Sequence, residues 1–152
     1  MKDELVAALP MLRAFARSLA GSRDRADDLV QETVMRALAN KDKFTEGTNL
    51  HAWLVTILRN QFYSEGRKRR REIEDADGTH AARLADIGGQ ASRVEMDDFL
   101  RAMQLLPDEQ REALILIGAS GFSYEEAAEI CRVRVGTVKS RVSRARARLE
   151  EI

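Results

Sequence analysis

The stretch SYEEAAEICRVRVGTVKSRVSRARARLEEI, residues 123–152, predicts a helix-turn-helix. Ser123 and Glu126 form an S-x-x-E capping box, which marks the start of a short first helix. After the turn CRVRVG, apolar residues recur at spacings of three and four, which places them on one side of a second helix. This stripe consists of Val135, Val138, Val142, Ala145, Leu149 and Ile152.

Charge of a single sign covers the rest of the second helix as far as Leu149. Between Cys131 and Leu149 there are seven basic residues and no acidic residue: Arg132, Arg134, Lys139, Arg141, Arg144, Arg146 and Arg148. The whole chain, by contrast, has 25 basic and 25 acidic residues and a net charge of zero. Cations concentrated on one helix of a neutral protein favour a polyanionic partner, and the helix-turn-helix suggests duplex DNA. The alternative is a solvated basic helix in an ordinary bundle.

The composition limits the class of protein. Hydrophobic residues make up 44% of the 152 residues, so the chain can build packed cores, either as one domain or as two small ones. The single cysteine, Cys131, excludes an internal disulfide framework and fits a reducing cytoplasm. No apolar run reaches the length of a membrane span, and the first residues lack the layout of a signal peptide, so we expect a cytoplasmic protein without membrane contact.

Helical periodicity divides the chain in two. Residues 1–72 hold amphipathic stripes from Leu5 to Leu19 and from Leu29 to Leu38. The most hydrophobic helix of this half has its apolar stripe from Leu50 to Phe62 and runs into the basic cluster from Arg67 to Arg71. Residues 73–94 are rich in Ala, Gly and Asp and predict a flexible linker. Residues 95–152 hold a helix up to Leu106, a new helix after Pro107, and the helix-turn-helix. The sequence therefore predicts an all-α protein of two small helical domains joined by a linker.

Four motifs in this order resemble the extracytoplasmic-function (ECF) sigma factors of bacterial RNA polymerase. They are DDLVQETVMRAL, F-x-x-G-x-N-L-x-A-W-L-x-x-I-L-R-N, LPxEQREAL, and GFSYEEAAEI followed by the basic helix. The resemblance covers nearly the whole chain, and the first thirty-odd residues are most similar to the general-stress sigma factors of alphaproteobacteria. It implies that the first domain, region 2, binds the polymerase clamp helices and opens the −10 promoter element. It implies that the second domain, region 4, reads the −35 element and contacts the polymerase flap.

The resemblance also implies three sets of site residues. The clamp-binding set is Asp27, Asp28, Gln31, Glu32 and Arg36, for which a solvated helix face is the alternative. The −10 set is Phe44, Asn49 and Asn60 around a flipped-out base, with Arg67, Lys68, Arg69 and Arg70 on phosphates. The −35 set is Thr137, Lys139, Ser140, Ser143 and Arg144 toward base edges, with Arg146 and Arg148 on phosphates.

Three positions need a separate interpretation. Trp53 has helical spacing with Leu50 and Ile57, so we expect a core residue, with base stacking as the alternative. Where the family usually has a Leu-Gly turn, this chain has Cys131-Arg132, so an arginine is expected to adopt a backbone conformation that suits glycine. Cys131 is then a small buried hydrophobe, with a redox switch as the alternative.

The predicted function is promoter-directed initiation by core RNA polymerase at stress-response promoters, under control of a small helical anti-sigma factor. One alternative is a sigma-like decoy that sequesters the anti-sigma factor, although such a decoy would not need the basic residues kept here. A lone helix-turn-helix repressor would leave the first domain unexplained. An enzyme is disfavoured because His51 and His80 lack partners at ligand spacing, and no nucleophile motif or phosphate loop is present. We therefore expect no cofactor and no metal.

Overall fold

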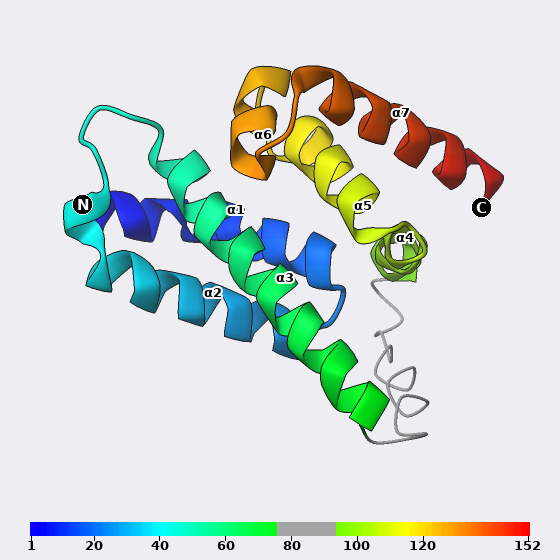
Figure 1. Ribbon diagram of the computed structural model, residues 1–152, viewed down its shortest axis with the longest axis horizontal. Helices are drawn as coiled ribbons and strands as arrows, with labels where there is room; N and C mark the ends of the chain where they lie inside the picture. Colours follow the sequence, from blue (N-terminus) through cyan, green and yellow to red (C-terminus); the bar gives the residue numbers. More distant parts are fainter. Residues whose placement is uncertain (76–93) are drawn as a thin grey trace.

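The computed structural model describes residues 1–75 and 94–152, and within those ranges it contains helices and no strand. Figure 1 shows two groups of helices lying against each other. The first group contains α1 (Lys2–Ala20), α2 (Arg23–Ala39), the 3₁₀ turn η1 (Lys41–Lys43) and α3 (Leu50–Asp75). The second contains α4 (Val94–Gln104), α5 (Asp108–Leu114), the π-helical turn η4 (Ile115–Ala119), α6 (Tyr124–Cys131) and α7 (Val135–Glu151). The predicted all-α fold with two helical units is confirmed.

The first group is organised by the predicted apolar stripes. The stripe of α1 is buried and ends at Gly21, whose φ of 83° terminates the helix. Ser22 then caps α2 by accepting a hydrogen bond from the backbone N–H of Arg25 at 3.3 Å. Helix α3 crosses α1 and α2 in Figure 1 and buries Leu54 and Leu58 completely. The three stripes thus face a common core.

Helix α3 runs through the basic cluster, as the sequence predicted, and ends a few residues beyond it. It continues to Asp75, past the expected domain end at residue 72, because the basic residues after Phe62 are good helix formers. Of the predicted linker, 73–94, residues 76–93 lie outside the described residues. None of the helices that the structure describes is both long and apolar enough to span a membrane.

The second group is built around the helix-turn-helix. The predicted capping box is present: Ser123 Oγ accepts the N–H of Glu126 at 3.0 Å, and Glu126 Oε1 accepts the N–H of Ser123 at 2.8 Å. Arg132 ends α6 in the left-handed conformation, with φ 58° and ψ 46°, as predicted for the Cys131-Arg132 turn. Helix α7 follows and packs Val138 and Val142 against α5 and α6. The capping box and the turn together fix the direction of α7.

The two groups share a single hydrophobic core. Its buried members include Leu12 and Leu58 from the first group and Met103 and Leu116 from the second. Contact is especially close at Gly21, where a Cβ atom would lie 2.7 Å from Cδ of Gln104, so any larger residue would displace that side chain. The structure therefore places the two predicted units directly against each other.

Candidate nucleic-acid interface

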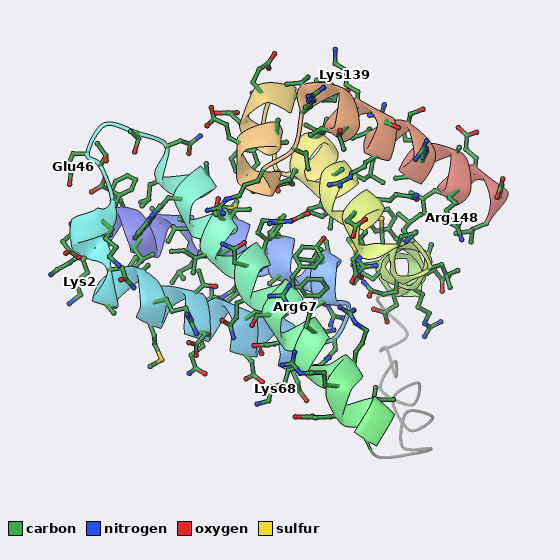
Figure 2. The ribbon with its side chains drawn as sticks, viewed as in Figure 1. Lys2, Glu46, Arg67, Lys68, Lys139 and Arg148 are labelled. Atoms are coloured by element: carbon green, nitrogen blue, oxygen red, sulfur yellow. The ribbon has the colours of Figure 1, made fainter. Side chains whose placement is uncertain are left out.

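The predicted −35 residues lie on the solvent side of α7. Its apolar stripe is buried at Val138, Val142 and Ala145, which fixes the rotation of the helix about its axis. The opposite side carries the exposed Lys139, Ser143, Arg144, Arg146 and Arg148, with Thr137 and Ser140 half-buried at its edge. Figure 2 shows Lys139 and Arg148 near opposite ends of α7, away from the first group of helices. The helix therefore presents a continuous cationic face.

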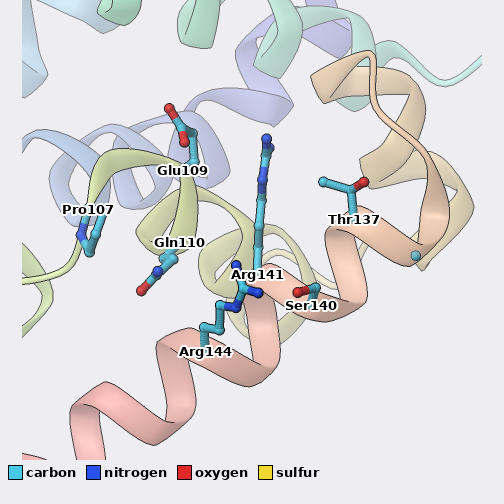
Figure 3. Close-up of a pocket in the computed structure, with 8 residues that line it drawn as sticks. Pro107, Glu109, Gln110, Thr137, Ser140, Arg141 and Arg144 are labelled. Carbon is cyan, nitrogen blue, oxygen red and sulfur yellow. The ribbon is translucent and has the colours of Figure 1, made fainter.

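A hollow of about 490 Å³ lies beside this face. Thr137, Ser140 and Arg144 line it from α7, and Pro107 and Gln110 line it from the start of α5 (Figure 3). Arg141, one of the seven basic residues but not a member of the −35 set, also lines the hollow and adds a further cation, and Glu109 of α5 contributes a carboxylate. The base-reading set of α7 thus borders a concave surface rather than a flat one.

Tyr124 orients one of the predicted base-reading residues. The ammonium nitrogen of Lys139 lies 5.5 Å from the centre of the Tyr124 ring, within the range of a cation–π contact. Tyr124 is the first residue of α6, so the contact joins the two helices of the helix-turn-helix. This contact restricts the positions that the long Lys139 side chain can reach on the solvent side of α7.

The second cationic area lies at the far end of α3. Arg67, Lys68 and Arg70 are exposed there, and Arg69 is half-buried (Figure 2). Burial, with the nearby charge of Arg69, lowers the pKa of Arg25 to about 10. Arg25 of α2 therefore lies close enough to Arg69 for the two positive charges to interact, which extends the cationic area from α3 onto α2.

Of the three residues predicted around a flipped-out base, Phe44 and Asn49 lie beside the start of α3, and Asn60 lies almost three turns further along that helix. Phe44 and Trp53 lie with ring centres 5.1 Å apart, and Trp53 is half-buried against the core while also lining a cleft of about 280 Å³. Asn49 Oδ1 accepts the N–H of Ala52 at 3.1 Å, which caps the first turn of α3. Asn60 is exposed further along the same helix. Trp53 packs against the core, as we expected, and its side chain also borders the cleft.

The predicted polymerase-binding residues form an outer face of α2. Asp27, Asp28, Gln31 and Arg36 are exposed, and Arg36 Nε pairs with Glu32 Oε2 at 2.8 Å. An exposed pair of this kind contributes only about 0.5 kcal/mol to stability. Pairing within α2 therefore does not account for the run of polar side chains on this face. The face is free for a partner.

Sequence reasoning missed a buried polar centre between the two groups. Glu112 on α5 is completely buried and is held by Arg59 and Tyr63 of α3. Burial would lower the pKa of Arg59, but the hydrogen bond and charge of Glu112 outweigh it and raise that pKa. Burial and the charge of Glu112 also raise the pKa of Tyr63 and bring that of Cys131 to about 12. No local signal marked this centre, because Arg111 and Glu112 end the polar stretch DEQRE and have the pattern of solvated charges.

Two family models match the two helical groups. Residues 5–72 match the model described as sigma-70 region 2, and residues 96–149 match the model described as sigma-70, region 4. The chain is 60% identical over 152 residues to the ECF RNA polymerase sigma factor EcfG of Rhodopseudomonas palustris, covering all of this chain and 84% of that one.

Two solved structures extend the comparison. The sigma factor RpoE of Bartonella quintana, in complex with the anti-sigma factor NepR, is 54% identical with a TM-score of 0.84, covering 99% of this chain and 94% of that one. The anti-anti-sigma factor PhyR of the same organism, complexed with NepR, is 18% identical with a TM-score of 0.66, covering 99% of this chain and 50% of that one. The likeness to PhyR extends to the fold alone.

Both regions and the cationic helix-turn-helix define a sigma factor of the sigma-70 type. At 60% identity to EcfG, the chain belongs to the ECF family of RNA polymerase sigma factors. Its partners are accordingly core RNA polymerase and promoter DNA, and its function is to direct the polymerase to promoters and initiate transcription.

Proposed function

We propose that residues 1–72 act as region 2 on the polymerase clamp and the −10 element, and that residues 95–152 act as region 4 on the −35 element. The protein works in the cytoplasm at general-stress promoters. The observation that carries the proposal is α7: a buried stripe fixes the helix in a helix-turn-helix, and every charged side chain that it exposes before Leu149 is a cation.

Within region 4, the position along α7 separates two roles. Lys139 and Arg144 lie near the hollow and the turn, so they read base edges, where each good contact is worth about 1–3 kcal/mol of discrimination. Arg146 and Arg148 lie further toward the C-terminal end and neutralise phosphates, which adds affinity without sequence preference.

Gel shifts across salt concentrations separate these roles. Lys139→Ala and Arg144→Ala should lose more affinity for a cognate −35 duplex than for a scrambled one. Arg148→Ala should weaken both equally and reduce the salt slope by about 0.9 for the lost phosphate contact. Equal losses on both duplexes for all three variants would refute the assignment of the base-reading face.

Within region 2, the start of α3 receives the −10 strand. Phe44, Asn49 and Asn60 bind a base that leaves the stack, and the basic end of α3 follows the phosphates. The polar face of α2 binds the clamp. Asn60→Ala should leave binding to core polymerase intact and lower open-complex formation, whereas Asp28→Arg should lower polymerase binding itself. The opposite result for either variant would overturn the corresponding assignment.

A small helical anti-sigma factor controls the protein. The similar RpoE was solved with the anti-sigma factor NepR, and the present chain exposes apolar side chains that an amphipathic helix can cover. Met96, Phe99 and Leu105 are between 49% and 62% exposed around α4. We expect the anti-sigma factor to cover the polar face of α2 as well as these apolar side chains, so a NepR-type protein titrated into the sigma–polymerase complex should release the sigma factor. A fully active ternary complex would contradict shared surfaces.

A further inference from the structure

Arg25 of α2 occupies a position that does not favour a cation. It is the third residue of that helix, where the positive end of the helix dipole repels positive charge. Its side chain is half-buried, and its Nε is buried without a hydrogen-bond partner among the residues that the structure describes. A buried polar atom with no partner costs free energy. Packing alone would therefore favour an uncharged side chain at this position.

The guanidinium of Arg25 is held against α3. Its Cζ lies 5.0 Å from the centre of the Phe62 ring, within the range of a cation–π contact. Phe62 is only 4% exposed, and it belongs to α3, which crosses the start of α2 (Figure 1). The contact therefore sets the direction in which the Arg25 side chain extends from α2.

A second cation lies next to this contact. Arg69 follows Phe62 by seven residues, or about two helical turns, so both lie on the same side of α3. Burial and then the charge of Arg69 lower the pKa of Arg25, which shows that the two guanidinium groups interact. Arg25 and Arg69 thus form a cationic pair that joins the start of α2 to the basic end of α3.

The carboxylates nearest to this cationic pair already have partners. Gln61 Nε2 donates a hydrogen bond to Glu65 Oε2 at 2.9 Å. Arg111 Nη2 donates to Asp108 Oδ1 at 2.6 Å. Both acids offset part of the repulsion that Arg25 experiences, but Arg25 forms no ion pair within residues 1–75 and 94–152. The cationic pair is therefore left with an unmatched positive charge.

We propose that Arg25 is a further DNA-binding residue, which together with Arg69 holds a phosphate of the promoter backbone next to the −10 element. The inference rests on the proposed role of the basic end of α3 on the −10 phosphates. A phosphate supplies the counter-charge that Arg25 lacks, and a guanidinium suits it because several N–H groups donate in one plane. Helix α2 then serves two partners: its outer polar face binds the polymerase clamp, and Arg25 binds DNA.

Arg25→Met tests this contact in the complex with core polymerase. Methionine keeps an unbranched side chain on the Phe62 ring and removes the charge. At about 0.15 M salt, the complex should bind a fork-junction −10 duplex about fivefold more weakly, and the slope of log affinity against log salt should fall by about 0.9. The loss should be equal on a scrambled −10 sequence, because a phosphate carries no sequence information. Arg13→Met, at an exposed position of α1, should change neither quantity.

The stability of the variant provides a second readout. Because Arg25 is partly buried without a counter-ion, the urea midpoint of Arg25→Met should be no lower than that of the wild type. A clear drop in the midpoint, or a chain that does not fold, shows that Arg25 serves the fold and overturns the proposal. Weaker binding to core polymerase with an unchanged salt slope on DNA assigns Arg25 to the polymerase interface and also overturns it.

Arg67→Met and Arg70→Met distinguish failure of this proposal from failure of the −10 assignment. Both residues are exposed at the same end of α3, so each variant should lower the salt slope in the same assay. If they lower it and Arg25→Met does not, the role of Arg25 alone is wrong. If none of the three variants lowers it, the assignment of the basic end of α3 to the −10 phosphates fails as well.

Discussion

Replacing Arg111 with methionine should lower the free energy of unfolding by about 3 kcal/mol. Arg111 is only 3% exposed, and its guanidinium donates to the backbone oxygens of Leu19 at 2.9 Å and Leu106 at 2.8 Å. These oxygens lie at the end of α1 and just beyond α4, where helix carbonyls have no partner within their own helix.

The magnitude follows from those contacts. A hydrogen bond from a charged donor contributes about 1.5–3 kcal/mol, so the two bonds to carbonyls amount to at least about 3 kcal/mol. We take the low end because removing a buried guanidinium also removes its desolvation cost. The pair with Asp108, which is 42% exposed, adds less than about 1 kcal/mol. Methionine fills the volume of the arginine stem, so no large cavity contributes.

Urea unfolding followed by far-ultraviolet circular dichroism measures this loss. Arg36→Met is the matched control, because it breaks only the exposed pair with Glu32 and should cost about 0.5 kcal/mol or less. The Arg111→Met loss should persist at high salt, since a buried contact is little screened. A loss no larger than that of the control would refute the account of Arg111 as the cap of two helix ends.

Four further outcomes are expected. Ser123→Ala should lower the free energy of unfolding by about 1 kcal/mol through loss of the cap, as read from thermal unfolding. Hydrogen bonds from Ser123 lower the pKa of Glu126. The ionised Glu126 therefore stabilises the fold above the ordinary carboxyl pKa, and this contribution is lost as the pH falls through the lowered pKa. The difference in unfolding free energy between the wild type and Glu126→Gln should accordingly shrink in acid. Arg132→Gly should raise the urea midpoint, because a left-handed arginine carries a penalty of about 1 kcal/mol that glycine avoids, and an unchanged midpoint would argue against strain at this turn. With a pKa of about 12, the thiol of Cys131 should react with iodoacetamide near neutral pH far more slowly in the folded chain than in urea, and equal rates would contradict its burial.

The local features of the fold were predictable from the sequence. The capping box at Ser123 and the apolar stripe of α7 depend on residues a few positions apart, so the sequence carries their geometry directly. The left-handed Arg132 was predictable from the resemblance, because the family usually has a glycine at this turn position. The exposed cations of α7 follow from the stripe, because residues off the buried side of a helix face solvent.

The contacts between the two groups were not predictable from pattern. Glu112 meets Arg59 across 53 positions of sequence, and Arg111 meets Leu19 across 92. In the sequence these two charges are indistinguishable from solvated ones, since only the packing of α5 against α1 and α3 buries them. The π-helical turn was also missed, because its bond from Ser120 N–H to Ile115 O at 2.8 Å depends on how the chain leaves α5 rather than on a residue signature.

In vitro transcription with purified core polymerase tests the central claim most directly. On a library of promoters, core polymerase with this protein should initiate at a subset that shares one −35 and −10 pair, while either component alone should give no promoter-specific transcript. A folded chain that neither co-purifies with core polymerase nor directs it to any promoter would contradict the account.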